Sequence, residues 1–113
     1  MSQSLFKRVT DRLQTIHPNK KKRRSSKWPK VRNEYARLNP TCAVCGGIKK
    51  IQIHHIADFS TTPELELATD NLMTLCMKRK CHYFFGHLNS WRSINVDVIE
   101  DAKYFSRKIR NRR

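Results

Sequence analysis

"CAVCGG" at residues 42–47 and "CMKRKCH" at residues 76–82 are the two stretches that decide the fold of this 113-residue chain. A pair of cysteines separated by two residues can reach one zinc ion with both sulfurs at about 2.3 Å, and a second pair completes a tetrahedron. The two glycines after the first pair supply the backbone freedom that such a turn requires. We therefore predict a structural zinc site, with two disulfides or a redox pair as the alternatives. Its ligands are Cys42, Cys45, Cys76 and Cys81.

The small size of the chain makes a stabilising device necessary, because a chain of this length buries only about two thirds of its surface. Zinc held by four thiolates would couple metal binding to folding and would leave no open coordination position for catalysis. The sequence has neither a secretory signal pattern nor a run of about 20 apolar residues that could span a membrane. We therefore expect a cytoplasmic protein without membrane contact, where thiols bind metal more often than they form disulfides.

Positive charge dominates the chain, with 24 Lys and Arg against 9 Asp and Glu and a net charge of +15. Residues 1–40 hold 12 basic and 2 acidic side chains, residues 41–77 hold 2 and 4, and residues 78–113 hold 10 and 3. Two basic flanks around a weakly acidic centre indicate a protein that grips a nucleic acid, and a solvated basic surface is the alternative. The predicted phosphate contacts are Lys20, Lys21, Lys22, Arg23, Arg24, Lys78, Arg79, Lys80 and Arg92.

Residue spacing predicts an α+β chain with helices on both sides of a turn-rich centre. A first amphipathic helix is expected within residues 5–16, and a second begins near Trp28 with Ser26 as its cap. Residues 51–56 and 71–76 have the pattern of short strands joined by a polar loop, and another helix is expected to begin within residues 77–88. The apolar positions from Val96 to Ile109 predict a C-terminal helix. We expect the aromatic residues of the centre to form its core, namely Trp28, Tyr83, Phe84, Phe85 and Trp91.

Two adjacent histidines, His54 and His55, lie on the first predicted strand. Neighbouring side chains on a strand point to opposite faces, so the two imidazoles cannot both pack into one core. One can bind a metal ion while the other addresses a water molecule. Asn71 lies between the two cysteine pairs, and His82 and His87 follow the second pair.

The order Cys-x2-Cys, His-His, Asn and Cys-x4-Cys-His resembles the HNH endonuclease family, whose fold is the ββα-metal finger, also called the His-Me finger. The resemblance covers roughly residues 28–95, including "HHIADF", "ELELATDNLMTLC" and "CHYFFGHLNSW". The combination resembles in particular the small HNH proteins of bacteriophages. By this resemblance residues 28–95 form the nuclease core, and the spacing and charge of the flanks predict a basic helix and arm over residues 1–27 and a basic C-terminal helix over residues 96–113.

The resemblance implies a role for each polar residue of the centre. His55 would be the general base, and Asn71 would fix the loop that orients this base. His54, which stands where many family members have aspartate, and His82 would bind a catalytic divalent cation. His87 would be a third ligand or a phosphate contact, because an α-helix rotates it about 140° from His82.

The implied activity is metal-dependent hydrolysis of DNA phosphodiester bonds, by nicking or by double-strand cleavage. An imidazole with a pKa near neutrality suits the base, and a divalent ion stabilises the departing alkoxide. The ion would be Mg²⁺, Mn²⁺ or Ni²⁺, and the absence of the aspartate favours the latter two over oxygen-preferring Mg²⁺.

The resemblance also suggests a setting for this activity. A monomer with one site is favoured and should nick DNA. Phage relatives suggest genome packaging in the host cytoplasm, with terminase as a partner. The rival interpretation is a zinc-stabilised nucleic-acid-binding module without catalysis.

Overall fold

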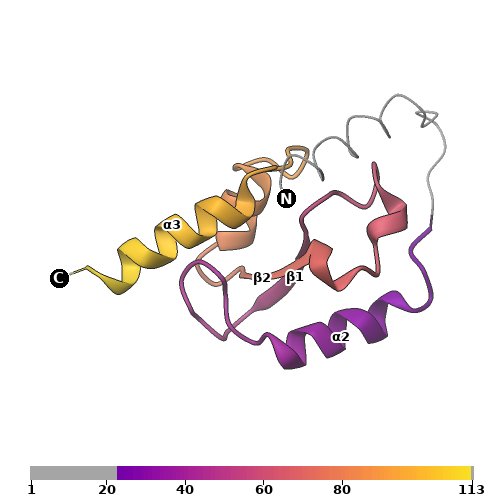
Figure 1. Ribbon diagram of the computed structural model, residues 1–113, viewed down its shortest axis with the longest axis horizontal. Helices are drawn as coiled ribbons and strands as arrows, with labels where there is room; N and C mark the ends of the chain where they lie inside the picture. Colours follow the sequence, from indigo (N-terminus) through magenta and orange to yellow (C-terminus); the bar gives the residue numbers. More distant parts are fainter. Residues whose placement is uncertain (1–22, 113) are drawn as a thin grey trace.

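The protein is described by a computed structural model that covers residues 23–112 (Figure 1). The predicted N-terminal helix, most of the predicted arm and Lys20, Lys21 and Lys22 therefore lie outside the described residues. Within the described part the elements follow the order helix, strand, strand, helix. They are α2 (Trp28–Leu38), β1 (Ile51–His55), the short turns η1 (Pro63–Leu65) and η2 (Thr69–Asn71), β2 (Leu72–Cys76), the π-helical turn η3 (His82–Gly86) and α3 (Val98–Arg110).

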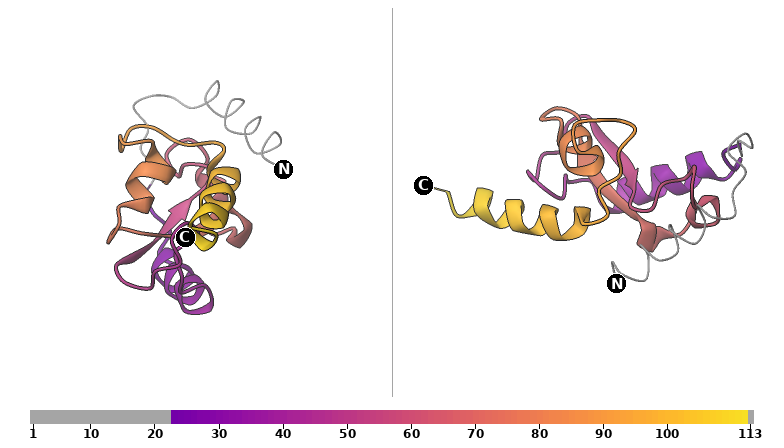
Figure 2. Two further views of the ribbon diagram at one scale, coloured as in Figure 1. Left: turned by 90° about the vertical axis from the view of Figure 1, so that its left-hand side faces the viewer. Right: turned by 90° about the horizontal axis from the view of Figure 1, so that it is seen from above.

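The two strands form an antiparallel hairpin, which confirms the predicted α+β class with a two-stranded sheet. Ile51 pairs with Cys76 at one end of the ladder, and His55 pairs with Leu72 at the other. Helix α2 lies on one side of this hairpin and η3 lies on the other (Figures 1 and 2). The two faces of β1 therefore meet different neighbours.

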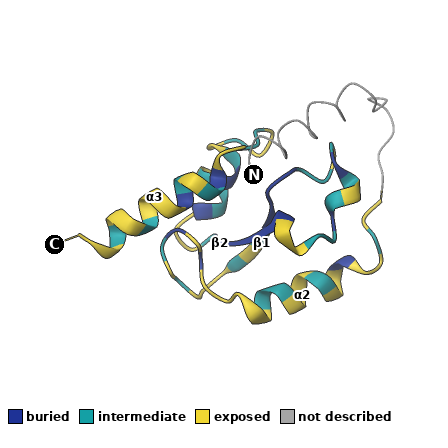
Figure 3. Cartoon of the chain, in the orientation of Figure 1, coloured by how far each residue is buried: buried dark blue, intermediate teal, exposed yellow. Residues whose placement is uncertain are grey.

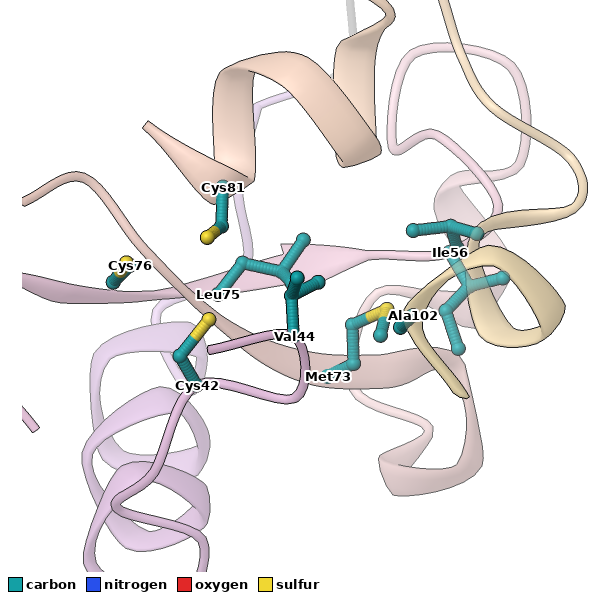
Figure 4. Packing of buried hydrophobic residues seen from close by; sticks show 9 residues of the cluster. Cys42, Val44, Ile56, Met73, Leu75, Cys76, Cys81 and Ala102 are labelled. Carbon is teal, nitrogen blue, oxygen red and sulfur yellow. The ribbon is translucent and has the colours of Figure 1, made fainter. Parts of the chain in front are cut away.

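The core lies between the hairpin, the first cysteine turn and the beginning of α3 (Figure 3). Leu75 of β2 and Val98 of α3 are completely buried. Burial of each of these two side chains contributes about 1.5–3 kcal/mol to the stability of the fold. In Figure 4 the cysteines gather at one end of this cluster, and Ile56 and Ala102 lie at the other end. The cysteine site is thus continuous with the apolar core.

Helix α2 begins at Trp28 without the predicted Ser26 cap. The N–H of Trp28 donates to the carbonyl of Ser25 at 3.0 Å, and no side chain caps the helix. Pro29 in the first turn supplies a backbone angle suited to helix initiation. The helix matters for the site because Trp28 is buried against β1, and its ring lies 4.4 Å from that of His55.

Helix α3 begins two residues later than the start predicted at residue 96. Asn95 organises this start, since its side-chain oxygen accepts from the N–H of Asp97 at 3.0 Å. Acidic residues occupy the first turn and basic residues the last, which complements the helix dipole. Among residues 23–112, no helix combines the length and the apolar character needed to cross a membrane.

Candidate metal centre

Four cysteine sulfurs meet at the end of the hairpin, as the spacing predicted. All four lie within 4.8 Å of one another, and the sulfurs of Cys45 and Cys76 are 3.5 Å apart. Thiolates bound to one tetrahedral zinc at about 2.3 Å would lie roughly 3.8 Å apart, so the spacing suits zinc. None of the four forms a disulfide. The cluster has the donors and the spacing of a site that could hold a zinc ion.

The first cysteine pair is shaped by a tight hydrogen-bonded turn. The N–H of Cys42 donates to the carbonyl of Gly47 at 2.8 Å, and the N–H of Gly46 donates to the carbonyl of Cys42 at 2.9 Å. Gly46 has a φ of 74°, a left-handed conformation that favours glycine. The second pair consists of the last residue of β2 and Cys81, the residue before η3. Both halves of the cluster are therefore fixed by backbone structure.

The thiols of the cluster differ in their electrostatic environment. Burial raises the pKa of Cys42 and that of Cys81. Burial also opposes ionisation of Cys45, but hydrogen bonds from Gly47, Cys76 and Arg79 outweigh it and lower the pKa of this thiol to about 7. The guanidinium of Arg79 donates to the sulfur of Cys45 at 3.7 Å. Arg79, which was predicted to contact phosphate, thus has a contact inside the cysteine site.

Three imidazoles form a second cluster on the opposite side of β1 from α2. The Nδ1 atom of His54 lies 3.1 Å from Nε2 of His82, and Nε2 of His87 lies 3.2 Å from the same atom. Nitrogen ligands at about 2.0–2.1 Å from one ion lie roughly 2.9–3.4 Å apart in octahedral or tetrahedral geometry. The three nitrogens therefore have the spacing of a metal-binding triad.

Hydrogen bonds on the outer side of the cluster fix two of the imidazole tautomers. The Nδ1–H of His82 donates to the side-chain oxygen of Gln52 at 2.7 Å, and the Nδ1–H of His87 donates to the carbonyl of Ser93 at 2.9 Å. In the neutral rings both Nε2 atoms then carry lone pairs that face each other. Such a contact is repulsive unless a cation lies between them, so the arrangement fits a bound metal ion.

His54 is the most deeply buried member of the cluster. The residue is 2% exposed; its Nδ1 atom is the one that approaches His82, and its Nε2 atom has no hydrogen-bond partner within the described part of the chain. Burial, together with the neighbouring imidazoles, lowers the pKa of His54 to about 2, and burial and His87 lower that of His82 to about 4. Both rings are therefore unprotonated at neutral pH and offer lone pairs to a metal.

The π-helical turn explains how His87 joins the cluster. An α-helix would rotate it about 140° from His82, whereas the wider π turn, which bonds residue i to i+5, brings positions five apart to one side. The predicted longer helix is thus replaced by the turn His82–Gly86. Gly86 is needed because a Cβ at this position would lie 3.0 Å from Cε1 of His54. Of the two uses predicted for His87, this placement corresponds to a ligand.

His55 lies on the other face of β1 from His54, as the alternation of strand residues predicted. Its Nε2–H donates to the carbonyl of Glu66 at 2.9 Å, which leaves Nδ1 as the ring nitrogen with a lone pair. Burial lowers the pKa of His55. The hydrogen bond to the carbonyl of Glu66 acts to raise this pKa, and the positive charge of Arg24 acts to lower it further. A neutral imidazole at neutral pH can accept a proton from water.

Arg24, from the basic arm, lies beside Nδ1 of His55. Its Nη1 atom is 3.5 Å from Nδ1 of His55 and 3.8 Å from a carboxylate oxygen of Glu66. Its guanidinium also lies over the rings of Phe59 and Trp28, at 4.4 and 5.2 Å from their centroids. The sequence predicted a phosphate contact for Arg24, and the structure places it next to the candidate base.

Asn71 ties down the loop between the strands. Its side-chain oxygen accepts from the N–H of Ala57 at 2.7 Å, and its amide donates to the carbonyls of Ala57 and Leu65 at 3.1 and 3.3 Å. Leu65 precedes the residue whose carbonyl accepts from His55. The loop-fixing geometry expected for Asn71 is therefore present in the structure.

The remaining predicted residues lie at the surface. Arg23, Lys78, Lys80 and Arg92 are exposed, a position open to phosphate contacts. The prediction of an aromatic core is wrong for Phe84 and Trp91, which are 47% and 54% exposed.

The sequence interpretation missed several residues that support the site, and one of them could have been found from spacing. Gln52 precedes His54 by two residues on a strand, so both face the same side. No comparable spacing in the sequence points to the other supporting residues, which are Glu66, Gly86 and Ser93.

Comparisons of this chain with models of known protein families, with curated proteins and with solved structures find no match.

Proposed function

We propose that this chain is a metal-dependent endonuclease of the HNH type that hydrolyses phosphodiester bonds in DNA. One observation carries the proposal. Nitrogens of His54 and His87 each lie 3.1–3.2 Å from Nε2 of His82, and the residue next to His54 is a fourth imidazole whose Nδ1 contacts only the guanidinium of Arg24 within the described residues. A triad of ligands beside a separate base supplies the parts that metal-assisted hydrolysis can use.

The order of the elements supports a ββα-metal core as the fold behind this site. The base and one ligand come from β1, the loop anchor is the last residue of η2, directly before β2, and the other two ligands lie at the first residue of η3 and directly after its end. The cysteine cluster lies at the opposite end of the same hairpin from His55. We propose that it holds the hairpin and η3 together without taking part in the reaction.

The protein residues supply a base, its orientation and a positive charge. Nδ1 of His55 takes a proton from the attacking water, while its Nε2–H bond to Glu66 keeps the ring in the required tautomer. Asn71 holds the loop that provides this acceptor. Arg24 places a guanidinium where it can donate to a phosphate oxygen beside the base. A divalent ion in the triad would stabilise the charge that develops on the phosphoryl and leaving oxygens.

The donor set of the triad bears on the identity of this ion. Three imidazoles and no carboxylate favour Mn²⁺, Ni²⁺ or another transition ion over Mg²⁺, which prefers oxygen ligands. The net charge of +15 supports binding to the DNA backbone with little sequence selectivity and with a steep dependence on salt. A monomer with one such site would nick DNA.

The test is cleavage of supercoiled plasmid with Mg²⁺, Mn²⁺, Ni²⁺ or no added divalent ion, by the unmodified chain and by His55→Ala. We expect nicking with at least one transition ion and a loss of rate of about 10²–10⁴-fold in the variant, the usual contribution of a general base. DNA affinity and divalent-ion binding should be kept, because His55 contacts neither the triad nitrogens nor the cysteines.

The rival function is a binding module without catalysis, and the contact between Arg24 and Nδ1 of His55 favours it because this contact covers the lone pair of the base. On that interpretation the unmodified chain binds DNA and cleaves plasmid with none of the ions. Equal nicking by the unmodified chain and by His55→Ala would also reject the proposed role of His55, since the rate would then not depend on this imidazole.

A further inference from the structure

Trp91 forms an exposed aromatic surface directly beside the histidine triad. Its ring centroid lies 5.3 Å from that of His82 and 4.9 Å from that of His87, yet the residue is 54% exposed. The ring of Tyr83 also packs against Trp91, with the two ring centroids 5.0 Å apart. A large ring at this position covers part of the candidate site without being buried in the core.

The backbone that presents Trp91 is an unusual turn. Leu88 and Asn89 have φ values of 53° and 65°, a left-handed conformation that is uncommon for any residue other than glycine and costly for leucine. The N–H of Asn89 donates to the carbonyl of Tyr83 at 3.1 Å, and the N–H of Ser90 donates to that of His87 at 3.0 Å. Such conformations persist where the surroundings determine them, and they concentrate at binding and catalytic sites.

The charge of the segment that carries Trp91 indicates the kind of ligand that this surface suits. Residues 72–96, which carry Trp91, His82 and His87, contain four basic and no acidic side chains. Arg92, the residue after Trp91, is exposed. An exposed aromatic ring within a uniformly basic segment matches a nucleotide, in which a flat apolar base is attached to an anionic phosphate.

We propose that Trp91 stacks on an unpaired base of the nucleotide next to the cleaved phosphodiester, so that the chain selects single-stranded or locally unpaired DNA. This inference rests on the proposed function, because it takes the triad as the point of cleavage. Stacking on an aromatic ring serves every base and therefore adds no sequence preference. A base inside a duplex must first be unstacked and unpaired, which offsets the gain.

The experiment measures DNA affinity by fluorescence anisotropy in the cleavage-silent His55→Ala chain, without added divalent ion. The ligands are a short single strand, the matched duplex and the same duplex with a central unpaired bubble. Trp91→Ala is compared with Trp91→Phe, which keeps an aromatic face. The matched control is Tyr104→Ala, because Tyr104 is 51% exposed and lies in α3.

We expect the parent chain to bind the single strand and the bubble more tightly than the duplex. Trp91→Ala should lose roughly 10-fold in affinity for the unpaired ligands, a typical effect of removing one stacking ring, and little for the duplex. Trp91→Phe should keep most of the preference, and Tyr104→Ala all of it. Indole fluorescence, measured with His55 intact and without divalent ion, should be quenched by the single strand when Trp91 is present and not in Trp91→Phe, since the other tryptophan, Trp28, is buried against His55.

Equal losses in Trp91→Ala and Tyr104→Ala would overturn the inference, as would quenching that persists in Trp91→Phe. An unchanged preference in Trp91→Ala together with weaker divalent-ion binding would show that the ring only shields the metal ligands. These results are independent of cleavage. If the unmodified chain nicks no plasmid, the proposed function fails, and the binding data still decide the role of Trp91.

Discussion

The cysteine cluster and the histidine cluster are both groups of side chains beside one hairpin that could hold a metal ion, but they differ in completeness. Four sulfurs within 4.8 Å of one another supply every ligand of a tetrahedral ion. The histidine triad supplies three nitrogens and leaves at least one position open for water or substrate. The number of protein ligands therefore separates a site suited to stability from a site suited to chemistry.

The two clusters also differ in how their geometry is set. The first cysteine pair depends on a hydrogen-bonded turn with glycine at a positive φ, and its sulfurs join the buried core. The triad depends on hydrogen bonds to Gln52 and Ser93 that orient two rings from outside. Changes to the cysteine cluster should therefore affect folding, whereas changes to the triad should affect only the second metal.

The largest expected effect is that of Cys76→Ser, which removes a ligand at the cysteine end of the core that is only 1% exposed. Structural zinc contributes apparent binding free energies of about 10–16 kcal/mol in small zinc-dependent domains, so loss of one thiolate should unfold this chain. Circular dichroism and zinc content report the result. A variant that stays folded without zinc would show that folding does not depend on the cysteine cluster, which would remove the distinction from the triad.

His54→Ala should abolish binding of the divalent ion to the triad while the cysteine-bound zinc and the fold are kept. The loss should exceed the roughly 10- to 100-fold that follows from removing an outer hydrogen-bond partner. Isothermal titration with Mn²⁺ or Ni²⁺ measures it. His54→Asp is the matched variant, because a carboxylate ligand should restore binding and shift the preference toward Mg²⁺. Loss of zinc in His54→Ala would show that the two sites are not independent.

Gln52→Leu should weaken divalent-ion binding about 10- to 100-fold, since it removes the acceptor that orients His82. Gln52→Glu keeps an acceptor and should retain the affinity or increase it. Gln52 is exposed, so neither change should alter the melting temperature much. If both variants bind the ion as the unmodified chain does, the tautomer of His82 is set by something else.

The smallest effect is expected from a pair of glycine substitutions that act on different clusters. Gly46→Ala meets no atom within 4 Å but must adopt a φ of 74°, so it should cost about 1 kcal/mol of folding stability. Gly86→Ala would place a Cβ 3.1 Å from Nδ1 of His54, so it should weaken divalent-ion binding instead. Chemical denaturation and metal titration of both variants separate these outcomes. Identical profiles would contradict the assignment of one glycine to each cluster.

The features that the sequence predicted are those that depend on local spacing. The cysteine cluster follows from two short pairs, and the opposite directions of His54 and His55 follow from the period of a strand. The contact of Arg24 with His55 could not be predicted, because it joins positions 31 residues apart. The same holds for Glu66, whose role depends on the path of a loop without regular structure, and for the exposure of Trp91, which depends on two left-handed residues.

The π-helical turn has a consequence for how this arrangement is detected in other chains. Two ligands on one side of an α-helix are three or four positions apart, whereas His82 and His87 are five apart and still share one side. Deleting a single residue between them would return the pair to α-helical spacing with both rings on the same side. A search pattern that fixes this interval at one value would miss pairs with the other, and the pattern should accept both four and five.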